Sequence, residues 1–103
     1  MATRRFFLRG DIDLATAADL RSELESLVAA IDGDLVLDCC GLTFIDSTGV
    51  SVIVATQHAL NARGNELRVA NVDGVAARVL DVLGLTEALH VNEPEGAHPD
   101  LIA

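Results

Sequence analysis

The feature that most constrains the fold is a regular alternation of strand-like and helix-like segments along the 103 residues. Short apolar runs, typical of buried strands, alternate with longer stretches in which apolar residues recur every three or four positions. The order is strand, helix, strand, helix, strand, helix, which predicts a single α/β domain with helices packed on a sheet. The expected strands cover residues 4–9, 35–40 and 66–70, and the expected helices cover residues 16–31, 47–63 and 75–83.

The boundaries of the first segments follow from glycines and capping residues. Leu35–Cys40 is nearly continuous in apolar residues, which suits a central strand covered on both faces. Gly41 is expected to end that strand, and Gly10–Asp13 is expected to end the first one. Thr16, with Asp19 three residues later, resembles a capping box at the start of the first helix.

The C-terminal part is expected to be less regular. Thr86 is expected to cap a short turn, and Val91 is expected to add a brief strand. Residues 93–103 contain both prolines of the chain. This composition predicts a flexible C-terminal tail and leaves residues 1–92 as the folded domain.

The charge balance of the chain excludes some classes of function. Sixteen acidic and seven basic residues give a net charge of −9, and every basic residue is arginine. This balance argues against nucleic-acid binding, because a phosphate backbone requires a basic face. No segment approaches the roughly 18 apolar residues of a membrane span, and no signal peptide is visible. We therefore expect a cytoplasmic protein without direct membrane insertion.

The cysteines and histidines form no pattern typical of a catalytic, cofactor or metal site. Cys39 and Cys40 are adjacent, which is not a disulfide framework, and both are expected to be buried free thiols. An enzyme that uses either thiol is kept as an alternative. His58, His90 and His98 lack the spacing of metal ligands. We expect neither a cofactor nor a metal.

The segment Phe44–Val50 places two hydroxyls and one carboxylate where the chain turns from a strand into a helix. Free backbone N–H groups and the helix dipole favour a phosphate at such a point. Phosphorylation of Ser47 would add roughly −1.5 to −2 charges there. The plainer interpretation, in which Asp46, Ser47 and Thr48 only cap the helix, remains open. Nucleophilic catalysis by Ser47 is poorly supported, because no histidine base is evident.

The helix that follows this segment carries no charged residue from Ser47 to Ala62. An exposed helix usually carries charges on its outer face. We therefore expect this helix either to be covered by another element or to form a docking surface. Its weakly polar side carries Ser51, Ala55, Thr56, His58, Ala59 and Ala62.

The run from Leu37 to Val50, which contains an Asp-Ser-Thr-Gly motif, resembles the core of the STAS domain family (sulfate transporter and anti-sigma factor antagonist). Three further segments resemble family features: Gly10–Ala17 the entry to the first helix, Arg63–Leu67 the entry to the next strand, and Val79–Leu85 the end of the third helix. The resemblance covers about residues 5–91. It is greatest to the small bacterial anti-sigma factor antagonists.

The resemblance implies a protein that acts by binding rather than by catalysis. In that family the first hydroxyl residue of the motif accepts a phosphate, which places the acceptor at Ser47, with Thr48 as the second choice. The unphosphorylated form binds an anti-sigma factor serine kinase and releases the sigma factor; phosphorylation ends the contact, and a phosphatase restores it. The expected partner-binding residues are Asp11, Asp13, Asp46, Ser47, Thr48, Gly49 and Ser51.

Some implications of the resemblance remain open. The expected fold is a single STAS-like α/β domain with helices packed on a mixed sheet. The family usually has two strands before the first helix, but only nine residues precede Gly10. One N-terminal strand is therefore expected to be absent, which leaves a truncated start, a swapped strand or a homodimer as alternatives. Asp11 and Asp13 would need no function if they were plain turn residues. The alternative function is a constitutive STAS interaction subunit, for example of a membrane lipid transporter, without a phosphoswitch.

Overall fold

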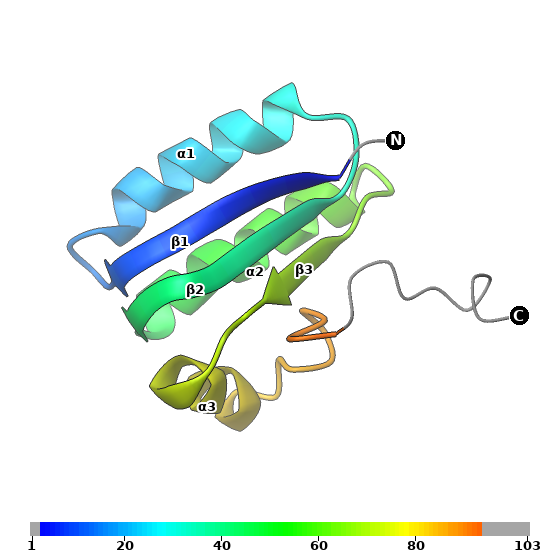
Figure 1. The fold of residues 1–103 in the computed structure, drawn as a ribbon. Helices are drawn as coiled ribbons and strands as arrows, with labels where there is room; N and C mark the ends of the chain where they lie inside the picture. Colours follow the sequence, from blue (N-terminus) through cyan, green and yellow to red (C-terminus); the bar gives the residue numbers. More distant parts are fainter. Residues whose placement is uncertain (1–2, 94–103) are drawn as a thin grey trace, which may run out of the picture.

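The structure is a computed structural model that describes residues 3–93, with three strands and three helices in alternation. The strands form one sheet in the order β1-β2-β3 (Figure 1). The alternation expected from the sequence is confirmed. The elements are β1 (Arg4–Ile12), α1 (Ala17–Ala30), β2 (Leu35–Ile45), α2 (Ser47–Asn61), β3 (Leu67–Ala70) and α3 (Gly74–Val82).

Both pairs of neighbouring strands are parallel. The expectation of a mixed sheet is therefore wrong for residues 3–93. Each connection between strands crosses over through a helix, which returns the chain to the same end of the sheet. β1 is an edge strand, and within the described part of the chain no strand pairs with its outer side.

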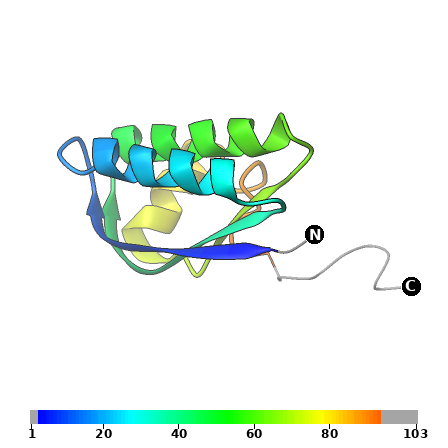
Figure 2. The ribbon, with the colours of Figure 1, turned by 90° about the horizontal axis from the view of Figure 1, so that it is seen from above.

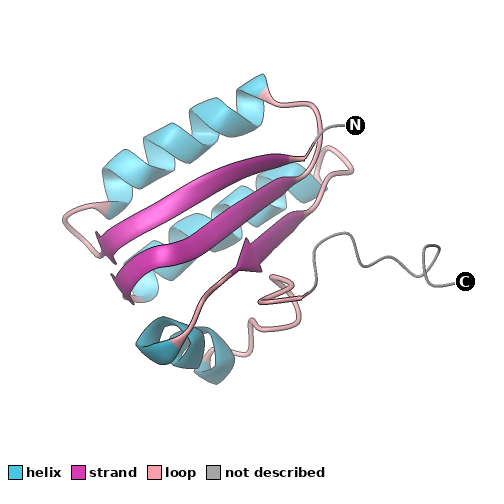
Figure 3. Cartoon of the chain, viewed as in Figure 1, coloured by secondary structure: helices cyan, strands magenta, loops and turns pink. Residues whose placement is uncertain are grey.

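Helices α1 and α2 lie side by side on one face of the sheet, as Figure 2 shows. The core lies between these helices and the sheet, and its fully buried side chains include Leu24, Leu37, Ile53 and Leu60. α3 follows β3 and lies beside the end of β2 (Figure 3). The opposite face of the sheet carries no described helix.

β1 and β2 both run through glycines that were expected to end them. β2 continues through Gly41, and β1 continues through Gly10, because the two strands remain hydrogen-bonded to each other. The pairing shifts register between Phe7 and Arg9 and again between Gly10 and Asp11. Such bulges absorb an irregular residue without ending a strand. The boundaries predicted from turn chemistry are therefore wrong at both glycines.

The capping box expected at Thr16 and Asp19 is also absent. Thr16 precedes α1 but makes no side-chain cap hydrogen bond. Its hydroxyl donates to the backbone oxygen of Asp11 at 2.9 Å and accepts from the backbone N–H of Asp13 at 3.0 Å. The Asp13 carboxylate accepts from the backbone N–H of Ala15 at 2.9 Å. These side chains stabilise the turn between β1 and α1 instead of the first turn of the helix.

The segment after α3 forms turns, and Val91 does not form the expected strand. The segment still contacts β3 through its backbone. Val69 N–H donates to Leu89 O at 3.1 Å, and Asn92 N–H donates to Val69 O at 2.8 Å. This segment therefore covers part of the outer edge of β3. Residues 94–103 of the expected tail lie outside the described residues.

Asp38 is a buried carboxylate on the sheet face opposite α1 and α2. It accepts from Arg5 Nη2 at 2.7 Å, from the backbone N–H of Cys40 at 3.0 Å and from Asn71 Nδ2 at 3.1 Å. Burial alone raises the pKa of this carboxyl group. The hydrogen bonds from Cys40, Asn71 and Arg5 together outweigh burial and lower the pKa to about 2. Asp38 and its three donors form a polar cluster that joins β1, β2 and the segment after β3.

Candidate functional site

The Asp-Ser-Thr-Gly motif lies where β2 passes into α2. Asp46 is the N-cap of α2, and its Oδ1 accepts from the backbone N–H of Gly49 at 3.0 Å. The Asp46 N–H donates to Ile12 O at 3.1 Å, which ties the start of the helix to the end of β1. The predicted cap is confirmed for Asp46. This side chain holds the motif in place, so Ser47 becomes the first residue of the helix.

Ser47 is exposed, and its hydroxyl makes no hydrogen bond to another residue within 3–93. Its backbone oxygen accepts from the Ser51 hydroxyl, which lies one turn further along the exposed side of α2, at 2.9 Å. Thr48 is half-buried. A modifying enzyme therefore has better access to Ser47 than to Thr48.

Gly49 lies inside the protein rather than on its surface. A methyl group at this residue would lie 2.7 Å from Ile12 Cγ2 and 2.8 Å from Ile45 Cγ1. A glycine lets the first turn of α2 pack closely on the ends of β1 and β2. The expectation that Gly49 contacts a partner is not supported, because the residue is buried. The close approach that this glycine permits is therefore internal.

Asp11 and Asp13 lie near the motif, because the carboxyl ends of parallel strands meet at one edge of the sheet. Asp11 is exposed, and its Oδ1 accepts from the Thr43 hydroxyl at 2.6 Å, which joins the ends of β1 and β2. Asp13 is half-buried and bonded within the turn described above. The structure therefore brings both carboxylates to the end of the sheet where Ser47 lies, but each already has a local structural role.

A hollow between the start of α2 and α3, here called the α3 hollow, was missed by the sequence analysis. Three of its apolar side chains are strongly exposed: Val75 by 61%, Val82 by 75% and Leu83 by 49%. Exposed apolar side chains that cluster in one place indicate a contact surface. The α3 hollow is lined by Ser47, Val75, Arg78, Val79, Val82 and Leu83.

The sequence did contain a signal for this surface. The buried side of α3 is provided by Ala76 and Leu80, while Val75, Val79 and Val82 occupy another side. A helix that is apolar on more than one side has more apolar surface than one sheet can cover. The signal does not reveal that the second side lies beside Ser47, because that depends on tertiary structure.

The weakly polar side of α2 is covered in part by α1. Thr56 is buried, and its hydroxyl donates to the backbone oxygen of Val52 at 2.8 Å. Between the two helices, Ala55 and Ala59 line a groove together with residues of α1. The missing charges of α2 are therefore explained in part by helix packing, and Ser51 and His58 remain exposed.

The two cysteines differ in their environment. Cys39 is buried as predicted, but Cys40 is exposed, because alternate residues of β2 face opposite sides of the sheet and its side lacks a covering helix. Burial and the charge of Asp38 raise the pKa of the Cys39 thiol to about 12. A hydrogen bond to Asp38 raises the pKa of the Cys40 thiol. Neither setting favours the reactive thiolate, which leaves the thiol-enzyme alternative without support.

Within residues 3–93, no three or more His, Cys, Asp or Glu side chains are arranged to hold a metal ion. None of the helices in this part of the chain is long and apolar enough to cross a membrane.

Relatives of known class align with most of this chain. Anti-sigma-B factor antagonists of Staphylococcus aureus (strain NCTC 8325 / PS 47) and Staphylococcus epidermidis are each 30% identical over 84 residues. The aligned region covers 82% of this chain and 78% of each relative.

Solved structures share the fold. A crystal structure of an anti-sigma factor antagonist from Mycobacterium paratuberculosis has a TM-score of 0.79 at 23% identity, covering 88% of this chain and 77% of that one. The anti-sigma factor antagonist SpoIIAA in its unphosphorylated form has a TM-score of 0.62 at 18% identity, covering 75% of this chain and 71% of that one. The sequence matches the STAS domain over residues 3–97. The chain therefore belongs to the STAS domain family.

Proposed function

We propose that this protein is an anti-sigma factor antagonist that is switched off by phosphorylation of Ser47. In its unphosphorylated form it binds an anti-sigma factor that is also a serine kinase, and the sigma factor is released. The observation that carries the proposal is the exposed Ser47 hydroxyl, which has no partner within residues 3–93 and lies beside the apolar α3 hollow. The names of the relatives that are 30% identical support the same class of function.

The proposed contact surface combines Ser47 with its neighbours. Ser51 extends the surface along α2, and the α3 hollow adds an apolar part. Asp11, Asp13, Asp46 and Thr48 lie near Ser47 and form the rest of the proposed contact region. Asp46 and Asp13 contribute mainly by holding the local backbone, since their carboxylates accept backbone N–H groups.

A phosphate on Ser47 would affect binding far more than folding. At the first residue of α2 it would lie near free backbone N–H groups and the positive end of the helix dipole, which the fold tolerates. In a partner interface the same charge would lose its water. Such desolvation costs a few kcal/mol, and about 1.4 kcal/mol changes an affinity tenfold. The switch therefore acts on the complex and leaves the domain folded.

This chain provides the phosphate acceptor and not the catalyst. In the proposed reaction a bond forms between Ser47 Oγ and the γ-phosphorus of ATP, and the bond from that phosphorus to the β–γ bridging oxygen breaks. ADP leaves with the bonding electron pair, and the hydroxyl proton passes to a base of the kinase. A phosphatase reverses the modification with water and releases inorganic phosphate.

Incubation with the cognate kinase and ATP, followed by peptide mapping in a mass spectrometer, tests the acceptor. We expect phosphate on Ser47 in the unaltered protein and its loss from that peptide in Ser47→Ala. Phosphate on neither Ser47 nor Thr48 would contradict the proposal. Phosphate on Thr48 alone would move the switch to the half-buried hydroxyl and would also contradict it.

A further inference from the structure

We propose that Arg78 binds the phosphate group of phosphorylated Ser47 within the same chain and thereby closes the α3 hollow. The inference rests on the proposed function, because it concerns the modified form of Ser47. It adds a regulatory step to that site: the phosphate would remove the docking surface as well as add charge to it.

Ser47 and Arg78 line the same hollow from two different helices. Ser47 is the first residue of α2, and Arg78 lies in the middle of α3. The other lining residues are all apolar, so Arg78 is the one charged side chain that the described residues contribute to this hollow. A charge introduced on Ser47 would therefore find its counter-ion across an apolar surface.

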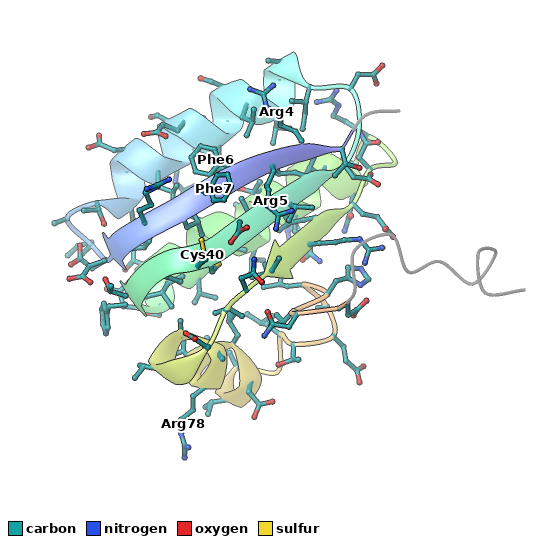
Figure 4. All side chains as sticks on the ribbon, viewed as in Figure 1. Arg4, Arg5, Phe6, Phe7, Cys40 and Arg78 are labelled. Atoms are coloured by element: carbon teal, nitrogen blue, oxygen red, sulfur yellow. The ribbon has the colours of Figure 1, made fainter. Side chains whose placement is uncertain are left out.

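Arg78 is available for a new partner. It is exposed, makes no hydrogen bond or ion pair with another residue of 3–93, and extends away from α3 in Figure 4. Two other arginines are already engaged: Arg63 donates to the backbone oxygen of Ile31 at 2.8 Å, and Arg68 lies 3.7 Å from Glu66. Arg78 lies one turn from Val75 and from Val82, on the exposed apolar side of α3.

The charges around the hollow favour this pair. A phosphoserine carries roughly −1.5 to −2 charges and three acceptor oxygens, which a planar guanidinium can bind in a bidentate manner. The nearby acidic residues are Asp46 before α2, Asp73 before α3 and Asp81 within α3. The whole chain has a net charge of −9. These carboxylates repel a phosphate, and the positive charge of Arg78, which lines the hollow, offsets this repulsion.

The pair would change what a partner meets. Without phosphate, Val75 and Val82 are exposed and the guanidinium of Arg78 is free for a contact with the partner. With phosphate, the guanidinium would lie over these side chains toward Ser47. The partner would then lose an apolar contact and a cation in the same step.

A test that needs no kinase uses protein with phosphoserine incorporated directly at residue 47. The ionisation of the phosphate is followed by phosphorus-31 NMR as a function of pH. We expect the second pKa of the phosphoserine to be lower with Arg78 than in Arg78→Gln by about half a pH unit, since a cation favours the dianion. Arg78→Lys should retain part of this lowering, and 1 M salt should reduce it.

The matched control is Arg21→Gln, which removes the same charge from an exposed residue of α1. This variant should titrate like the unaltered phosphoprotein. Equal titration curves with and without Arg78 would overturn the inference, as would an equal change in Arg21→Gln, which would indicate an effect of net charge alone. The two proposals can fail separately. If Arg78 lowers the pKa of the phosphoserine but the kinase transfers no phosphate to Ser47, the proposed function is rejected and the Arg78–phosphate contact is retained.

Discussion

Two polar clusters in this small domain have opposite properties. Around Asp38, on the open face of the sheet, a buried carboxylate is surrounded by donors from β1, β2 and the segment after β3. Around Ser47, at the end of the sheet, an exposed hydroxyl has no partner within residues 3–93 and lies beside exposed apolar side chains. The first cluster lies within the sheet and the second lies where β2 passes into α2, and only at Asp38 is the polar side chain bonded to several donors of the described residues.

The difference teaches how stability and switching can be separated in one chain. A buried charge whose donors are all internal contributes to folding, and a change there costs stability. A polar group without internal partners contributes little to folding, so its chemistry can change while the fold persists. We therefore expect changes near Asp38 to affect unfolding and changes near Ser47 to affect binding.

The largest expected effect is on stability, from Asp38→Ala. The substitution removes the carboxylate that accepts from the Arg5 guanidinium, the Asn71 amide and the Cys40 N–H, and we expect a loss of about 3 kcal/mol in the free energy of unfolding. Urea unfolding measures it. Asp32→Ala, which removes a carboxylate from an exposed residue, serves as the control and should change stability by less than about 0.5 kcal/mol. Equal losses in both variants would show that the bonded carboxylate of Asp38 contributes no more to stability than an exposed one.

A second prediction concerns acid. The folded pKa of Asp38 is about 2, below the 3.8 of an ordinary aspartate, so its contribution to stability is present above pH 4. It is lost as the pH falls from about 4 to 2, because the unfolded chain then binds the proton more readily; the loss is about 2 kcal/mol. Urea unfolding at several pH values measures the slope. In Asp38→Asn this part of the slope should disappear, and an unchanged slope would contradict the assignment.

A third prediction concerns binding of the kinase at the α3 hollow. Val82→Asp places a charge in the α3 hollow, where Val82 is 75% exposed. We expect at least about a tenfold weaker complex with the anti-sigma factor kinase, or about 1.4 kcal/mol, and little change in stability. Isothermal titration calorimetry and a thermal melt measure the two quantities. Leu14→Asp, at an equally exposed residue before α1, is the control and should bind normally.

The sequence predicted the local parts of this account better than the tertiary ones. The order of elements and the Asp46 cap follow from periodicity and from residues that act within one turn. The ends of β1 and β2 were wrong, because pairing between the strands overrides the turn preference of Gly10 and Gly41. The exposure of Cys40 was missed for a similar reason: it depends on which face of the sheet the helices cover.

The candidate site shows the same division. Ser47 could be identified from a motif at a strand-to-helix junction, and its exposed hydroxyl agrees with that prediction. Gly49 was predicted to contact a partner; in the structure it is buried, and its missing side chain permits the internal contact with Ile12 and Ile45. Arg78 and the α3 hollow could not be predicted, because no local pattern places α3 beside the start of α2.

The central claim is that charge on Ser47 ends binding without unfolding the domain. The most direct measurement compares Ser47→Asp and Ser47→Ala with the unaltered protein for affinity to the anti-sigma factor kinase and for thermal midpoint. We predict that Ser47→Asp binds at least about tenfold more weakly, that Ser47→Ala binds normally, and that all three midpoints agree within about 2 °C. Normal binding by Ser47→Asp, or a loss of its folded state, would contradict the claim.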